Sequence, residues 1–221
     1  ISLQKNIYQS NTSLRPCKRQ PVTMISKALF LVPSLLVGVL CRSVVLPPPP
    51  DSANVHITHF PITDVHRVDP FAPCCNQPRR LMLSLYQPTS CSQTKDIPYM
   101  PPQTAAICDD LITTAGFPNG AFSPLRLRTC PRRPKNNAFP LLVFSPGWDF
   151  SRYAWGNLLQ WIASTGFNII SIDHTYDANI VEFPDGTLIP GQNLTTDQFF
   201  AELPELLEVR LADVSTVLDA L

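Results

Sequence analysis

The stretch that decides the fold is PLLVFSPGWDFSRYAWGNLLQWIASTGFNIISIDHTYD, residues 140–177. Residues 141–144 form a short apolar run that ends at Ser-Pro-Gly, and residues 167–172 form a second apolar run rich in β-branched residues. Both runs are typical of strands that are buried on both faces. Two such strands joined by an amphipathic helix predict a right-handed crossover in a parallel sheet, where ligands bind at the carboxyl ends of the strands.

The segment between the two runs is predicted to be a helix. Apolar residues recur there at steps of three and four, namely Trp155, Leu158, Leu159 and Ile162. Asp149 or Ser151 is expected to cap the start of this helix, and Gly166 sits where a left-handed residue commonly ends one. The loop of residues 145–150 is therefore expected at the ligand-binding edge of the sheet.

The run FSPGWDFSRYAWGNLLQWIASTGFNIISIDHTYDANIVEFPDG resembles the platelet-activating-factor acetylhydrolase family, in particular its fungal secreted members in the α/β-hydrolase superfamily. That family has a strand ending in F-S-H/P-G-L-G, a helix, A-S-H/T-G-F/Y, and a strand running into D/E-H. The blocks DPFAPCCNQPRRLMLSLYQP, YMPP and EVRLADVSTVLD also look like the family. The resemblance covers residues 55–221 and implies the N-terminal part of an α/β-hydrolase, with a mostly parallel sheet after an antiparallel leading hairpin.

The nucleophile of such an esterase is expected in a G-x-S-x-G turn between a strand and a helix, because only small residues fit around the serine. The two glycines four residues apart in this sequence, Gly116 and Gly120, enclose Pro118 instead of a serine. In this fold the nucleophile precedes the acid and the histidine along the chain. We therefore expect the chain to be truncated before the nucleophile elbow, with the Ser/Asp/His triad absent and these residues inactive by themselves.

Half of an oxyanion hole is predicted in the loop of residues 145–150. Acyl transfer builds negative charge on the carbonyl oxygen, and a fixed backbone N–H aimed at it lowers the barrier by about 3 to 4 kcal/mol. Matching SPGWD to the family's S-H-G-L-G assigns the donor to the backbone N–H of Trp148, with Gly147 supplying backbone freedom. Pro146 replaces the family's histidine and Asp149 its second glycine, and a plain strand-to-helix turn is the alternative.

Other polar residues are weaker candidates for the chemistry. Ser145 ends a strand, but Pro146 follows it and no helix starts there, so we do not expect it to be a nucleophile. His174 lies at the carboxyl end of a strand ahead of the expected serine, and it is interpreted as a residue that organises a loop. His56 and His59 are three residues apart on a strand, which points their rings to opposite faces and disfavours a shared metal ion.

Charged and apolar residues elsewhere are given structural interpretations. Arg79 and Arg80 enter a predicted strand, and a solvated strand edge is favoured over a pair that contacts a phospholipid phosphate. Three apolar residues near Gly116 are expected either to face lipid or to pack ordinarily: Phe117, Phe122 and Leu125.

The remaining elements follow from local patterns. Residues 55–60 predict an edge strand, the alternating leucines at 81, 83 and 85 predict a half-buried antiparallel strand, and residues 104–113 predict a short helix. The turn residues at 184–187 predict a hairpin between the apolar runs on either side. A long C-terminal helix is expected, with one face formed by Leu203, Leu207, Leu211, Val214, Leu218 and Leu221.

Composition and the N-terminal residues indicate export. Lysine plus arginine equals aspartate plus glutamate at 17 each, which gives no net charge that recruits nucleic acid. Residues 1–23 are interpreted as a leader outside the native protein, and residues 24–43 as a signal peptide with a charge before an apolar run. Residues 44–54 are interpreted as a proline-rich linker, and residues 55–221 as the partial hydrolase domain.

Cysteine usage is consistent with secretion. Five cysteines follow the expected signal peptide, and disulfides among them are expected with the pairing left open: Cys74, Cys75, Cys91, Cys108 and Cys130. Asn193-Leu194-Thr195 is a glycosylation acceptor pattern in a secreted protein.

The resemblance implies a secreted serine esterase that releases short or oxidised sn-2 acyl groups from phospholipids without a metal or another cofactor. Its partners are then a phospholipid or another small ester, with transient contact to a lipid surface and none to nucleic acid. Two alternatives stay open: an α/β-hydrolase that acts on another ester, and a secreted binding protein that keeps the fold without catalysis.

Overall fold

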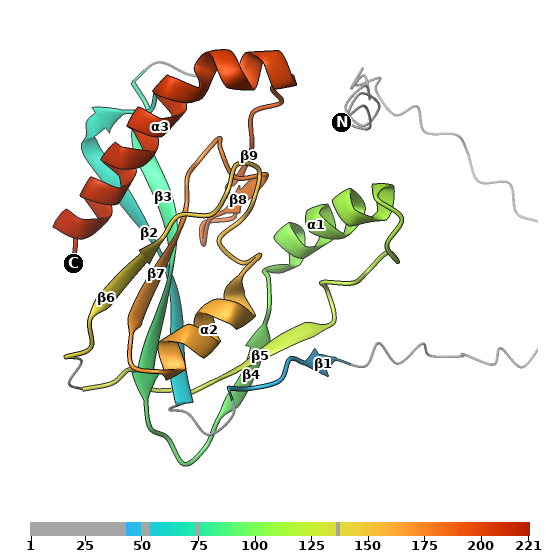
Figure 1. The fold of residues 1–221 in the computed structure, drawn as a ribbon, viewed down its shortest axis with the longest axis vertical. Helices are drawn as coiled ribbons and strands as arrows, with labels where there is room; N and C mark the ends of the chain where they lie inside the picture. The colour runs from blue at the N-terminus through green and yellow to red at the C-terminus, as the bar shows by residue number, and fades with distance from the viewer. Residues whose placement is uncertain (1–42, 50–53, 74–75, 136–137) are drawn as a thin grey trace, which may run out of the picture. The chain divides into compact units, whose positions relative to one another are not determined.

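A four-stranded sheet in the order β2-β3-β7-β6 forms the centre of the fold (Figure 1). The computed structural model describes residues 43–49, 54–73, 76–135 and 138–221. The strands of this sheet are β2 (Asn54–Val68), β3 (Pro78–Thr89), β6 (Leu141–Phe144) and β7 (Asn168–Asp173). The expected leader and the expected signal peptide up to residue 42 lie outside the described residues.

The pairing of the strands confirms the central prediction. The two apolar runs of residues 140–177 form β6 and β7, which pair in parallel. β3 pairs antiparallel with β2 on one side and with β7 on the other. The described sheet is therefore mixed, and it has more antiparallel than parallel pairs because the leading hairpin supplies half of its strands.

β3 is buried on both faces, so the prediction of a half-buried strand is wrong. Leu81, Leu83 and Leu85 are buried on one face, as their alternation indicates, but Met82 and Tyr86 between and after them are buried as well. The reason is the position of β3 inside the sheet, with a helix over each face. Alternation identified the strand correctly but could not show that its second face is also covered.

Helices α2 (Gly156–Ser164) and α3 (Thr196–Asp219) pack on opposite faces of the sheet (Figure 1). Leu159 of α2 belongs to a buried cluster with Tyr86 of β3. Val217 of α3 belongs to a second cluster with Leu83 and Ile172. Each cluster buries one face of β3 and β7, and the burial of apolar surface holds both helices in place.

The buried face of α3 differs from the apolar stripe in the sequence. Leu206, Asp213 and Val217 face the protein, whereas Leu211 of the stripe is 71% exposed. Other members of the stripe are also exposed: Leu207, Leu218 and Leu221. The inner face contains a carboxylate because that carboxylate is paired with buried arginines of the sheet, as described below. The start of α3 is a capping box in which Thr195 accepts a hydrogen bond from the Gln198 N–H, 3.3 Å away.

Smaller elements flank the main sheet. The helix expected at residues 104–113 is α1 (Pro102–Thr114), and the expected hairpin is β8 (Ile180–Glu182) with β9 (Leu188–Pro190). A second sheet joins β1 (Val44–Val45), β5 (Leu125–Thr129) and β4 (Lys95–Pro98). Sequence reasoning missed β4 and β5, and it assigned Val44–Val45 to a linker, although these two residues pair with β5.

The apolar residues near Gly116 divide between packing and exposure. Phe122 and Leu125 pack against the cluster that contains Tyr86, whereas Phe117 is 61% exposed. Ordinary packing therefore accounts for two of the three. Within the described part of the chain, none of the helices has both the length and the apolar character that a bilayer crossing requires.

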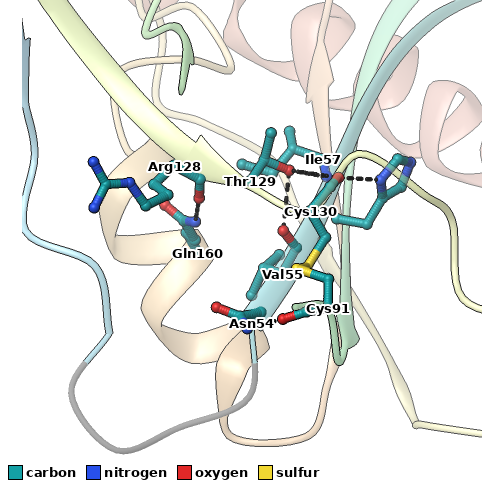
Figure 2. The surroundings of a disulfide bond; sticks show 9 residues. Asn54, Val55, Ile57, Cys91, Arg128, Thr129, Cys130 and Gln160 are labelled. Atoms are coloured by element: carbon teal, nitrogen blue, oxygen red, sulfur yellow. Dashed lines mark hydrogen bonds between the residues drawn. A yellow bond between two sulfur atoms is a disulfide. The ribbon is translucent and has the colours of Figure 1, made fainter. Parts of the chain in front are cut away.

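A disulfide joins Cys91, after β3, to Cys130, at the end of β5 (Figure 2). Next to it, the Thr129 hydroxyl donates to the Val55 carbonyl and accepts from the Ile57 N–H, both at 3.0 Å. The disulfide and these hydrogen bonds attach the small sheet to the edge strand β2. The expectation of a disulfide is confirmed, while Cys108 is a buried free thiol and the Cys74–Cys75 pair lies outside the described residues.

Candidate functional site

The loop of residues 145–150 leaves the carboxyl end of β6, where the sequence places the candidate site. β6 ends at Phe144, and Pro146 cannot donate to a continued ladder. The Phe150 N–H donates to the Gly147 carbonyl at 3.2 Å and closes a tight turn. The helix that follows starts later than predicted, because its N-cap is Trp155 and neither Asp149 nor Ser151 caps it.

The left-handed residue of this loop is Asp149, not Gly147. Asp149 has φ +64, whereas Gly147 is not among the residues with positive φ in the described chain. A side chain at Gly147 would meet only the Phe150 ring, at 3.7 Å. Asp149 occupies the position of the family's second glycine, and this is the position that needs the left-handed conformation. Aspartate is among the non-glycine residues that adopt this conformation most readily.

Two anchors hold the ends of the Gly147–Trp148 dipeptide, and both involve Asp177. On one side, the Asp149 N–H donates to the Asp177 carbonyl at 3.1 Å. On the other side, Arg210 of α3 donates to the Pro146 carbonyl at 2.6 Å. The same guanidinium forms a two-pronged ion pair with the Asp177 carboxylate, at 2.6 and 2.5 Å.

The Trp148 N–H makes no hydrogen bond with any described residue. The indole of Trp148 packs against Phe199 of α3, with 5.3 Å between ring centroids. Trp148 is only partly exposed, while Gly147 beside it is exposed. This N–H lies between two anchored residues at the carboxyl end of β6, where the sequence predicts an oxyanion donor.

A serine, a histidine and an aspartate form a chain of hydrogen bonds beside this loop. His174 Nε2 lies 2.9 Å from Ser145 Oγ, and His174 Nδ1 lies 2.8 Å from Asp213 Oδ2. Because Nδ1 faces a carboxylate, it carries the proton, and Nε2 accepts from the serine hydroxyl. Ser145 is exposed, whereas His174 and Asp213 are 2% and 0% exposed. Sequence reasoning considered Ser145 and His174 separately and missed Asp213.

Asp213 is also the partner of two arginines. Arg79 donates to its two carboxylate oxygens at 3.1 and 2.7 Å, and Arg67 donates to it as well. Burial alone would raise the pKa of Asp213, but the hydrogen bonds from His174 and Arg79 outweigh burial and lower this pKa to about 2. Asp213 is therefore a carboxylate throughout the ordinary pH range, and it neutralises buried positive charge.

Arg79 corrects the prediction of a solvated pair of arginines. Its side chain is 0% exposed and also binds Asp69 at 2.9 Å. Arg80 is partly exposed, pairs with Asp185 at 2.8 Å, and lies over the Phe183 ring. Arg79 is therefore enclosed by its carboxylate partners, whereas Arg80 forms a partly exposed ion pair, as expected at a strand edge.

His56 and His59 of β2 have separate partners. His56 Nδ1 lies 2.8 Å from the Cys130 carbonyl, and His59 Nδ1 lies 2.8 Å from Ser84 Oγ. Burial and the nearby Arg152 guanidinium lower the pKa of His59 to about 3. No cluster of three or more His, Cys, Asp or Glu side chains suited to a metal ion occurs among the described residues.

A sheet of this order, with helices on both faces and the similarity to an esterase structure given below, defines the described part of the chain as α/β-hydrolase in fold. The chain is 31% identical over 204 residues to a protein of Arthroderma benhamiae named probable 1-alkyl-2-acetylglycerophosphocholine esterase. That name describes a platelet-activating-factor acetylhydrolase, so the resemblance to this family is confirmed. No protein-family model matches the chain.

The comparison of structures gives a second esterase. The chain is similar to the ferulic acid esterase from Streptomyces cinnamoneus, with a TM-score of 0.63 and 26% identity. The similarity covers 80% of this chain and 49% of that chain, while the match to the Arthroderma protein covers 86% of this chain and 52% of the relative. This chain thus spans about half the length of both proteins.

Proposed function

We propose that these residues belong to a serine esterase that hydrolyses the sn-2 acyl ester of glycerophospholipids and prefers short or oxidised acyl groups. The observation that carries the proposal is the anchored Gly147–Trp148 dipeptide, whose free Trp148 N–H can stabilise an oxyanion. The name of the Arthroderma relative supports an acetylated ether phospholipid as the substrate class. Asp149 supports this loop through its backbone N–H, and Asp177 supports it through its carbonyl and its carboxylate.

The nucleophile belongs to a part of the protein other than the described residues. In an elbow-type esterase the second oxyanion donor is the N–H of the residue after the nucleophilic serine. Ser145 is followed by Pro146, which has no N–H. The segment from Gly116 to Gly120 has the glycine spacing of the elbow, but its central residue is Pro118 and not a serine. A product of residues 44–221 should therefore give no turnover of p-nitrophenyl acetate above buffer.

The donor role of Trp148 is tested by removing its N–H. In the full-length protein, Trp148→Pro should lower kcat by about 10²–10³, because one oxyanion donor is lost. Trp148→Ala is the matched control, since it removes the indole but keeps the N–H. Equal activity of the two variants, with both folded by circular dichroism, would contradict the assignment.

The structural neighbour favours a second candidate, an esterase of the same fold that acts on an aromatic acid ester. Fold does not fix the substrate, so the two candidates are separated by kcat/KM on an acetylated ether phospholipid and on a feruloyl ester. A higher value for the phospholipid supports the first candidate. A higher value for the feruloyl ester supports the second, and no turnover of either ester by the full-length protein supports the non-catalytic alternative.

We also propose that the protein is secreted. The Cys91–Cys130 disulfide supports this, since disulfides persist mainly in oxidising compartments. Asn193, in the glycosylation pattern, is exposed. Fusing residues 24–50 to a reporter enzyme should send the reporter into the medium, and a reporter that stays in the cytosol would remove the claim.

A further inference from the structure

We propose that Arg210 is a positioning residue for the acyl-transfer site, acting with Ser145, His174, Asp177 and Asp213 as a loop anchor. This proposal rests on the proposed function, because the loop that is anchored carries the Trp148 oxyanion donor. The anchor joins the carboxyl ends of β6 and β7 to α3, which provides both Arg210 and Asp213 from adjacent turns. Through Arg210, α3 then helps to position the oxyanion donor, although α3 is not part of the loop that carries this donor.

The Ser145–His174–Asp213 distances match those of a nucleophilic triad, but four features make this row of hydrogen bonds an anchor instead. Pro146 after the serine cannot supply an oxyanion N–H. The Asp213 charge, which would stabilise an imidazolium, is already shared with Arg79 and Arg67.

The third feature concerns the serine hydroxyl. Ser145 Oγ lies 3.1 Å from Arg210 NH1 and 2.9 Å from His174 Nε2. It therefore accepts one hydrogen bond and donates another, and both hold it in a fixed position. The next helix begins only at Gly156, so Ser145 is also not at the tight strand-to-helix turn that exposes a nucleophile.

Peptide geometry explains how Arg210 acts on the donor loop. Arg210 holds the Pro146 carbonyl at 2.6 Å, and in a planar trans peptide the N–H of the next residue points the opposite way. Fixing this carbonyl therefore fixes the direction of the Gly147 N–H, directly before Trp148. The Asp149 N–H is held at the far side by Asp177, which Arg210 itself clamps. Loss of Arg210 removes the bond to the Pro146 carbonyl and the ion pair that positions Asp177, so each end of the dipeptide loses a support.

The donors of Arg210 are used inside the protein, which argues against a role as a binding site for the substrate phosphate. Its Nε and one terminal nitrogen bind Asp177, and the other terminal nitrogen binds Pro146 and Ser145. The Arg210 side chain is 18% exposed. A guanidinium with a buried carboxylate partner has little remaining capacity for an external anion.

The first test uses amide hydrogen exchange in the full-length protein, which needs no turnover. The Asp149 N–H is protected by its bond to Asp177, and Arg210→Met should raise its exchange rate by about tenfold or more. Arg210→Lys keeps the charge but loses the two-pronged geometry, and it should give an intermediate rate. Arg128→Met is the control, because Arg128 makes an exposed ion pair with Asp96 away from the loop. An unchanged Asp149 rate in folded Arg210→Met overturns the proposal.

The second test separates positioning from stability and from nucleophilic catalysis. Arg210→Lys should lower kcat by about tenfold with KM changed less than twofold, as expected when an N–H donor is misplaced. Ser145→Ala should keep covalent labelling by a fluorophosphonate, whereas labelling at Ser145 itself overturns the anchor. If the wild-type protein shows no turnover, the proposed function fails, but the exchange rate still decides whether Arg210 anchors the loop.

Discussion

The buried ion pair between Arg152 and Asp173 offers the sharpest test of how the segment after the loop of residues 145–150 is held. The two side chains are 1% and 0% exposed. Arg152 donates to Asp173 through both its backbone N–H and its guanidinium. Its Nε also donates to Ser84 Oγ at 2.9 Å. Arg152→Met keeps much of the volume but leaves a buried carboxylate without its cation.

The expected loss of stability is about 3–5 kcal/mol, because an uncompensated buried charge remains after one partner of such a pair is removed. Arg152→Met combined with Asp173→Leu should lose less than the single variant, since no charge is then left unpaired. Burial raises the pKa of Asp173 even beside Arg152, so the loss in the single variant should shrink as the pH falls and the carboxyl takes up a proton. Arg128→Met, at an exposed pair, should leave the urea midpoint nearly unchanged.

Urea unfolding followed by tryptophan fluorescence measures these changes. Trp148 lies in the loop, Trp155 is the N-cap of α2 and Trp161 lies within α2, so the fluorescence of all three tryptophans reports on the segment that Arg152 attaches. A single variant within about 1 kcal/mol of the wild type would refute the reasoning, as would a double variant that loses the sum of the two single losses.

Three further predictions concern the core, the disulfide and a buried histidine. Leu206→Ala should cost about 2–5 kcal/mol, whereas exposed Leu207→Ala should stay within about 0.5 kcal/mol, as measured by urea unfolding; equal losses would contradict the observed face of α3. Replacing Cys91 and Cys130 by serine should cost about 4 kcal/mol, since the disulfide closes a sequence separation of 39 residues; an unchanged thermal midpoint would argue against the bond. The folded state keeps His59 neutral at a pKa of about 3 against 6.5 when unfolded. Its contribution to stability is therefore full above pH 6.5 and falls by about 1.4 kcal/mol per pH unit below it, a slope that His59→Gln should flatten in urea titrations at several pH values.

The sequence by itself determined the local elements around the site. The two apolar runs became β6 and β7, the turn chemistry at 184–187 became the β8–β9 hairpin, and residues 104–113 became α1. These features depend on residues close together in the chain, whose periodicity and turn preferences are visible without a partner. The position of the loop at the carboxyl end of β6 follows from the same reasoning.

The tertiary structure alone decided which groups surround that loop. Ser145 and His174 are 29 residues apart, and Asp213 is 39 residues beyond His174. The apolar stripe of α3 only partly predicted its buried face: Val214 packs on the core, but Leu207 and Leu211 are exposed, because the helix turns Asp213 inward between Leu206 and Val217 to pair with buried Arg79. A buried arginine costs more to leave unpaired than several leucines cost to leave exposed, and that balance depends on contacts between distant segments.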